Sequence, residues 1–274
     1  MPSAGHSLRD TRSDRSGAQK RSPRILGRHT LLGALRLATA LALGMGAAAP
    51  LRAIDPPVRF DDASALLNFE HVSLAFDGDG LAGAAWIDYD NDRFLDLFLT
   101  NGRTQPNGLF HNDGHGGFVD VAAAAGVQDR RGSSGVVAAD FDNDGWPDLF
   151  LTGDGGVTGS GASPVVLYHN NGDGTFSDIT ATAGIVGPPT ANSAAVADID
   201  NDGFLDLFIG APGSLSGHEQ HANRLFHNNG DGTFTDISAS AGVHTAIGAF
   251  AALFSDYDHD GFIDLFAGNG KMSA

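Results

Sequence analysis

The sequence predicts an all-β protein built from a repeated unit, and three observations support this prediction. A nine-residue loop with aspartate at alternate positions runs straight into an apolar strand, and this pattern occurs four times. A second motif, rich in Asn-Gly and Asp-Gly steps, falls between successive copies of the loop. Between Arg59 and Gly270 no segment shows the 3.6-residue apolar period of an amphipathic helix.

Residues 1–53 differ in composition from the rest of the chain. They hold nine of the 16 Lys and Arg residues but only two of the 33 acidic residues. An apolar stretch, 31–43, and the small residues 46–49 follow most of the basic region. This order is typical of a secretory signal, and the apolar stretch is too short to span a bilayer. We therefore expect an exported protein without a transmembrane anchor, located outside the cytoplasm (secreted, cell-surface or periplasmic). The alternative is a basic tail on a cytosolic protein.

Residues 54–83 are expected to form a lead-in to the repeats, with strands near 58–60 and 69–73. Residues 78–83 match the G-x-G-x-x-G pattern, but the dinucleotide-binding form of that pattern opens a helix. Here the following residues predict a strand, so we set the nucleotide interpretation aside. The repeats themselves occupy residues 84–274.

The acidic charge of the chain is concentrated in the four loops. Beyond residue 53, seven Lys and Arg residues face 31 acidic residues, of which all but two are aspartates and 16 lie in the loops. Short aspartate side chains suit turns and cation cages. A chain of this charge excludes nucleic acid and anionic membrane surfaces as partners. Because there is no cysteine, bound metal rather than disulfides would supply cross-links.

The spacing of the motifs predicts the repeat architecture. The first loop residues are 52, 58 and 58 positions apart. Asn-Gly and Asp-Gly steps between apolar runs indicate a hairpin in each repeat, at 107–127, 165–185 and 223–243. Each unit then has about four short strands, and its length slightly exceeds that of common propeller repeats. We expect a β-propeller-type array of about four blades. The hairpin motif does not recur after the fourth loop, which predicts an incomplete array.

The four loops have the donor pattern of a calcium site. Carboxylates at positions one, three, five and nine can converge on one point, glycine at position six permits a sharp turn, and Ca²⁺ takes six to eight oxygen ligands. Magnesium is disfavoured because it keeps its waters, and zinc is disfavoured because the sequence offers no Cys and, as we assume, no inward-facing His. The alternative is that the aspartates are solvated turn residues, which four copies in register disfavour. The predicted ligands of up to four Ca²⁺ ions are Asp88, Asp90, Asp92, Asp96, Asp140, Asp142, Asp144, Asp148, Asp198, Asp200, Asp202, Asp206, Asp256, Asp258, Asp260 and Asp264.

The first loop departs from the pattern because Arg93 replaces glycine at position six. A positive φ there would cost an ordinary residue on the order of 1 kcal/mol. We expect this site to be the weakest, with the Arg93 cation partly substituting for metal.

The remaining polar motifs do not predict catalysis. His111, His169 and His227 recur at one position of the hairpin motif, 58 residues apart, so they cannot form one cluster, and we expect a structural role at the hairpin. His259 sits at an outward loop position and is expected to face solvent. No G-x-S-x-G elbow or Ser–His–Asp pattern is visible, and every clustered aspartate is accounted for as a ligand.

The loop and hairpin motifs together resemble the FG-GAP/VCBS repeat family, and within it the group of cartilage acidic and ASPIC/UnbV-type proteins. The resemblance extends from about residue 69 to 270. It implies a β-propeller, typically seven-bladed, with calcium loops like those of integrin α-subunits. No ASPIC/UnbV-like segment follows the fourth loop.

The sequence therefore favours an exported, calcium-binding, non-catalytic module for protein or glycan binding or adhesion. One alternative is the non-catalytic propeller part of a larger secreted enzyme, and another is a structural spacer.

Overall fold

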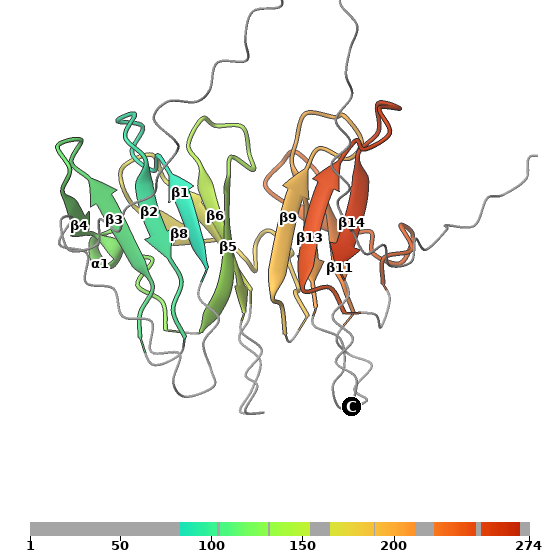
Figure 1. Ribbon diagram of the computed structural model, residues 1–274, viewed down its shortest axis with the longest axis horizontal. Coiled ribbons are helices and arrows are strands. Elements are labelled where there is room, and N and C mark those ends of the chain that lie inside the picture. The colour runs from blue at the N-terminus through green and yellow to red at the C-terminus, as the bar shows by residue number, and fades with distance from the viewer. Residues whose placement is uncertain are drawn as a thin grey trace, which may run out of the picture. The chain divides into compact units, whose positions relative to one another are not determined.

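The computed structural model describes residues 83–102, 105–130, 132–153, 165–188, 190–211, 222–244 and 248–268 (Figure 1). All of them belong to the second of two compact units, Arg59–Ala274. The predicted signal segment, 1–53, and the predicted lead-in strands lie outside the described residues. Gly83 ends the G-x-G-x-x-G pattern and is followed by a strand, as expected. None of the helices in the described part is long and apolar enough to cross a membrane.

The described strands form four antiparallel sheets, three of four strands and one of two. In the four-stranded sheets the strands lie side by side in chain order. The first sheet comprises β1 (Ala84–Ile87), β2 (Asp96–Leu99), β3 (Gly108–Asn112) and β4 (Phe118–Asp120). The second comprises β5 (Ser133–Ala139), β6 (Asp148–Gly153), β7 (Val166–Asn170) and β8 (Phe176–Asp178). The third comprises β9 (Ser193–Ala197), β10 (Asp206–Gly210), β11 (Arg224–Asn228) and β12 (Phe234–Asp236), and the fourth comprises β13 (Ala251–Ser255) and β14 (Asp264–Gly268).

The aspartate loop joins the first two strands of every sheet. In the second sheet Ala139, the last residue of β5, pairs with Asp148, the first residue of β6. The last aspartate of the loop is therefore the first residue of a strand, and the sheet fixes its backbone. Figure 1 shows these loops along the upper edge, together with the hairpins that join the third and fourth strands.

The hairpins form where the Asn-Gly and Asp-Gly steps predict them. In the second sheet Asn170 pairs with Phe176, and the N–H of Asn171 donates to the carbonyl of Thr175 at 2.9 Å. The positive φ values fall on Gly172 and Gly174, at 71° and 85°. The glycines of the motif thus adopt the positive-φ conformation that is unfavourable for residues with a side chain.

A single-turn helix, α1 (Ala122–Ala125), was not predicted by the sequence pattern. It follows β4, where the second and third repeats have turns. Four consecutive alanines favour a helical turn, and Asp120 accepts a hydrogen bond from the N–H of Ala122 at 3.0 Å. Four residues are too few to show an amphipathic period, so pattern analysis does not detect such a turn.

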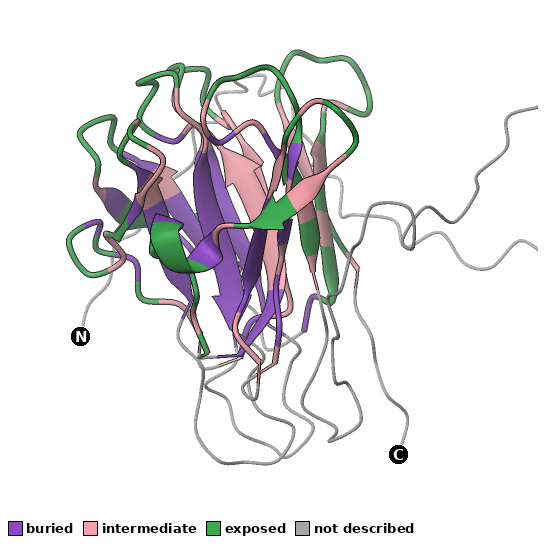
Figure 2. Cartoon of the chain, turned by 90° about the vertical axis from the view of Figure 1, so that its left-hand side faces the viewer, coloured by how far each residue is buried: buried purple, intermediate pink, exposed green. Residues whose placement is uncertain are grey.

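Apolar side chains pack between neighbouring sheets, and most strand residues of the first three sheets are buried or partly buried (Figure 2). The last aspartate of each loop is called the closing aspartate below. The phenylalanine two residues after it is fully buried in the first three sheets, as Phe98, Phe150 and Phe208. The same position in the fourth sheet, Phe266, is 70% exposed. The prediction of an all-β, propeller-type repeat array is confirmed. Within the described residues the array does not close into a barrel.

Candidate metal centres

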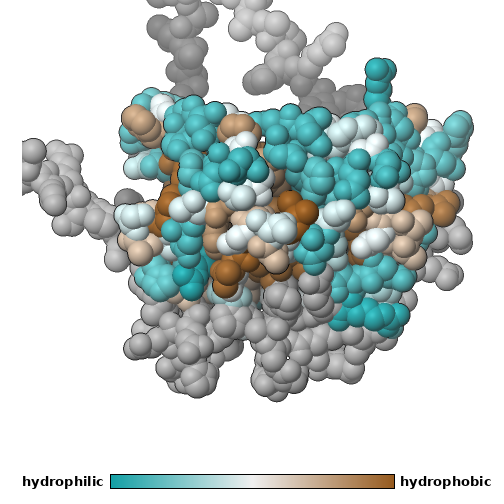
Figure 3. Space-filling model, turned by 180° about the vertical axis from the view of Figure 1, so that it is seen from behind, coloured by the Kyte–Doolittle hydropathy of each residue, from teal (hydrophilic) through white to brown (hydrophobic). Residues whose placement is uncertain are grey.

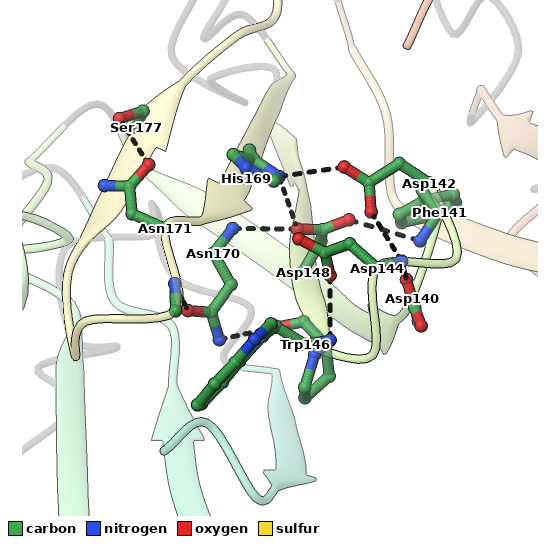
Figure 4. Close-up of polar contacts among 12 residues, drawn as sticks. Asp140, Phe141, Asp142, Asp144, Trp146, Asp148, His169, Asn170, Asn171 and Ser177 are labelled. Carbon is green, nitrogen blue, oxygen red and sulfur yellow. Dashed lines mark hydrogen bonds and ion pairs between the residues drawn. The ribbon is translucent and has the colours of Figure 1, made fainter. Parts of the chain in front are cut away.

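Each aspartate loop is held by hydrogen bonds from its own backbone to its own carboxylates. In the second loop, Asp140 accepts from the N–H groups of Asp144, at 3.2 Å, and Gly145, at 2.9 Å. The carboxylate of Asp144 accepts from the N–H of Trp146 at 2.8 Å (Figure 4). These contacts curl the chain around the carboxylates, as short Asp side chains do in turns.

The closing aspartate joins the loop to the hairpin of the same sheet. Asp148 is 2% exposed. One of its oxygens accepts from the N–H of Phe141 at 3.2 Å, and the other accepts from the N–H of Asn170 at 2.8 Å. The corresponding residues Asp96 and Asp206 are fully buried and accept the same two hydrogen bonds.

The carboxylate oxygens of the loops converge as a cation site requires. One oxygen from each of Asp140, Asp142 and Asp148 lies within 4.8 Å of the other two. Calcium–oxygen distances are about 2.4 Å, so two ligands on opposite sides of one ion are about 4.8 Å apart. In the first loop Asp88, Asp90 and Asp92 meet the same criterion. There the Oδ1 atom of Asp88 is buried without a hydrogen-bond partner, so the residues present fit a hard dication.

The third and fourth loops repeat the backbone hydrogen bonds of the second loop. Asp198 accepts from the N–H groups of Asp202 and Gly203, both at 3.0 Å. Asp256 accepts from Asp260 and Gly261, both at 3.1 Å. In the fourth loop the closing Asp264 accepts from the N–H of Tyr257 at 3.3 Å. Every predicted set of ligands is thus brought into one loop of the same shape. Hydrophilic side chains gather along this edge of the protein (Figure 3).

Burial leaves several of these carboxylates in a poor environment for negative charge. Desolvation raises the pKa of Asp148 to about 6, and the hydrogen bonds from Asn170 and Phe141 offset only part of this effect. Burial also raises the pKa values of Asp96, Asp142 and Asp206. A bound cation would favour the charged forms and reverse these shifts.

The hairpin histidines contact the aspartate loops. His169 Nδ1 lies 3.2 Å from an oxygen of Asp142 and 3.3 Å from an oxygen of Asp148. His111 and His227 have the same relationship to positions three and nine of their own loops. The assumption that no histidine faces the aspartates was therefore wrong. Each histidine is three residues before the first glycine of its hairpin, on the strand that pairs with the closing aspartate's strand, and this pairing could have revealed the contact.

The loop with Arg93 keeps the shape of the others. Arg93 has φ of 78°, near the 91° of Gly145, and its N–H donates to Asp88 at 3.1 Å. A Cβ atom built on Gly145 has no neighbour within 4 Å, so a side chain fits at this position and only the backbone conformation is strained. Within the described residues, the Arg93 guanidinium makes no ion pair with the loop aspartates. The expectation that its charge replaces metal receives no support. His259 is exposed, as expected.

Comparison with known proteins agrees with this geometry. The FG-GAP-like repeat family matches residues 88–151, 144–209 and 214–267, and the FG-GAP repeat matches residues 190–235. These matches cover more than half of the chain. The chain belongs to the FG-GAP repeat family.

The chain is also similar to three curated relatives. Cartilage acidic protein 1 of Mus musculus is 33% identical over 187 residues, which is 65% of this chain and 27% of the relative. The protein of the same name from Homo sapiens is 33% identical over 187 residues, covering 65% and 26%. That from Xenopus tropicalis is 31% identical over 202 residues, covering 67% and 28%. The chain thus spans about a quarter of the length of these relatives.

Proposed function

We propose that this chain is a calcium-binding FG-GAP module. The observation that carries the proposal is the convergence of three carboxylate oxygens, from Asp140, Asp142 and Asp148, within 4.8 Å of one another. In all four loops the N–H at position six donates to the first aspartate, so the loops share one backbone shape. Without a cation, such a cluster combines repulsion between carboxylates with the desolvation that raises the pKa of Asp148 to about 6. A dication would relieve both.

The chemistry of the donors favours calcium over other common cations. The ligand set consists of carboxylates, and calcium accepts flexible cages of oxygen ligands, whereas magnesium demands a near-ideal octahedron and keeps its waters. The imidazoles of His111, His169 and His227 give the first three clusters a nitrogen atom each, which zinc would accept. Carboxylates nevertheless outnumber it four to one, so calcium remains the proposed ion.

We further propose that the module is exported and non-catalytic, and that it binds an extracellular protein or glycan. The composition of residues 1–53 supports export. A binding role is supported because the four aspartate loops are repeated scaffold elements, each held by hydrogen bonds of its own backbone. The activity of the longer relatives is a separate matter, since the chain spans about a quarter of their length.

The metal proposal is tested by calorimetric titration with calcium and by thermal unfolding in calcium and in chelator. At a free calcium concentration one hundred times the dissociation constant, each occupied site adds about 2.7 kcal/mol. In a domain of this size that raises the Tm by about 5–10 °C. The Asp142→Asn variant should lose one site. Asp173→Asn removes one charge from an exposed hairpin outside the loops and should keep all sites.

An unchanged Tm together with no heat of binding would overturn the calcium proposal. The binding role is tested separately, by probing glycan and protein arrays with the calcium-loaded chain. Saturable binding that chelator abolishes is the expected result. The lack of any saturable ligand would favour a structural spacer instead.

A further inference from the structure

The aspartate loops of neighbouring sheets are joined by side-chain amides at loop position four. Asn91 Nδ2 in the first loop donates to the carbonyl of Gly145 in the second, at 3.0 Å. Asn143 Nδ2 in the second loop donates to the carbonyl of Gly203 in the third, at 2.9 Å. Both asparagines have left-handed backbones, with φ of 57° and 59°, a conformation that asparagine tolerates better than most residues.

These bonds end on the peptide groups that hold a candidate ligand. The carbonyl of Gly145 belongs to the same peptide as the N–H of Trp146, and this N–H donates to Asp144 at 2.8 Å. In the third loop, the peptide that accepts from Asn143 donates through Phe204 N–H to Asp202 at 2.9 Å. A hydrogen bond to the carbonyl of a peptide polarises its N–H and strengthens the next bond in the chain. The amide in one loop thus orients the position-five carboxylate of the next.

A second set of bonds runs in the opposite direction, from hairpin to preceding loop. Asn170 is fully buried, and its Nδ2 donates to the carbonyl of Tyr89 in the first loop at 2.8 Å. Its backbone N–H donates to the closing Asp148 of its own loop. Asn228 Nδ2 likewise donates to the carbonyl of Phe141 at 2.7 Å. Each of these asparagines therefore contacts two loops at once.

Aromatic packing keeps neighbouring loops and hairpins in this register. The rings of Tyr89 and Phe176 stack with centroids 6.3 Å apart, and those of Phe141 and Phe234 meet edge to face at 6.0 Å. In each pair the first ring stands at loop position two and the second belongs to the hairpin of the next sheet. A shift of one loop would therefore move the next hairpin.

We propose that the first three cation sites are thermodynamically coupled, with Asn91 and Asn143 as the positioning residues of the coupling. This inference rests on the proposed calcium function. A cation that orders one loop fixes its position-four amide, and this amide pre-orients a carboxylate of the next loop. Part of the entropy cost of ordering the next loop is then met before the second ion binds. Binding at the two sites is therefore cooperative, and the effect is reciprocal.

The fourth loop provides an internal comparison. Asn201 stands at position four of the third loop with φ of 62°. Within the described residues, its side chain makes no hydrogen bond to Gly261, the position-six residue of the fourth loop. The fourth site should therefore bind independently of the third.

The coupling can be measured at the second loop, which contains Trp146, one of only two tryptophans in the chain. In a Trp86→Phe background, Trp146 fluorescence reports calcium binding to that loop. The paired substitutions Asp200→Asn and Asp202→Asn remove the third site. We expect them to weaken calcium binding at the second loop about 5-fold or more, the lower end of typical coupling between sites.

The same removal of the third site in an Asn143→Gly background should leave the second loop unaffected. Glycine retains the left-handed backbone and lacks the amide, so this variant removes only the link. Asn201→Gly is the matched control, in which the 5-fold effect should persist. Calorimetry on the same chains gives the number and affinity of sites independently of the tryptophan signal.

The outcomes separate the two proposals. If the unsubstituted chain takes up no calcium, the proposed function fails, and the coupling fails with it. If calcium binds but removing the third site has the same effect with and without Asn143, the coupling is overturned and the calcium function stands. An effect that depends on Asn143 and not on Asn201 supports the coupling.

Discussion

His169 Nδ1 lies 3.3 Å from Oδ1 of Asp148, so the hairpin of the second sheet reaches into the aspartate loop of the same sheet. This contact gives a buried carboxylate a third polar neighbour, beside the N–H groups of Asn170 and Phe141. The same contact recurs in the first and third sheets. The histidine is therefore part of the cluster that we propose binds calcium.

Replacing this histidine should destabilise the protein in the absence of calcium. The His169→Phe variant keeps an aromatic ring but removes the polar contact with Asp148. Because the histidine is partly exposed, we expect a loss of about 1 kcal/mol in the free energy of unfolding. Urea unfolding in chelator measures the change.

His259→Asn is the control for that measurement. His259 is exposed at loop position four, where the other loops carry asparagine with similar positive φ. Its replacement should change the free energy of unfolding by less than about 0.5 kcal/mol. Equal effects of the two substitutions would show that the contact between His169 and Asp148 contributes nothing to stability.

The histidine also shows where sequence interpretation reached its limit. Loop residues such as Asp140, Asp142 and Asp148 could be grouped from the sequence because they are neighbours along the chain and their spacing is regular. His169 is 21 residues from Asp148, and only the register of β6 with β7 brings them together. Repeats and turns are local signals, whereas contacts between strands depend on a register that spacing does not specify. The cross-sheet bonds of Asn143 and Asn170 were missed for the same reason.

The fourth sheet allows a matched test of packing between sheets. Phe150 and Phe266 occupy the same strand position, but Phe150 is fully buried and Phe266 is 70% exposed. Truncation of a buried phenylalanine removes apolar contacts and leaves a cavity, so Phe150→Ala should cost about 3–5 kcal/mol. Phe266→Ala should change the free energy of unfolding by less than about 0.5 kcal/mol.

Chemical denaturation of both variants measures this difference. A large loss of stability in Phe266→Ala would mean that this side chain is covered in solution. The two residues have the same position in the repeat, since both follow a closing aspartate by two positions. Burial differs because it depends on the neighbouring sheet, which the local pattern does not describe.

Arg93 should carry backbone strain that glycine relieves. Its φ of 78° lies in the left-handed region, and the corresponding glycine positions have open space for a side chain. Arg93→Gly should therefore raise the free energy of unfolding by about 1 kcal/mol. It should also tighten calcium binding at the first loop, because the bound conformation is then reached with less strain.

The reciprocal change tests whether backbone strain is the cause. Gly145→Arg in the second loop should lower the free energy of unfolding by about 1 kcal/mol without loss of the fold. Unfolding curves in chelator and calcium titrations of both variants give the measurement. A loss of stability in Arg93→Gly would indicate that the arginine side chain makes a favourable contribution that outweighs its strain.

Gly210 should resist substitution because the third and fourth sheets approach closely at this residue. A Cβ atom added to Gly210 would overlap Ser193 Oγ and lie 2.6 Å from the carbonyl oxygen of Ala249. Ala249 also donates its N–H to Ala211 at 2.7 Å, so the backbone there has little room to move. Gly210→Ala should therefore cost about 1–3 kcal/mol through overpacking.

Gly268 stands at the same position of the fourth sheet and serves as the control. A Cβ atom added there would lie 3.6 Å from its nearest neighbour, an ordinary contact. Because alanine has less conformational freedom than glycine in the unfolded chain, Gly268→Ala should be neutral or stabilising by up to about 1 kcal/mol. Thermal and urea unfolding of both variants should thus give changes of opposite sign or clearly unequal size. Equal, small effects would mean that the third and fourth sheets can separate at Gly210 without cost.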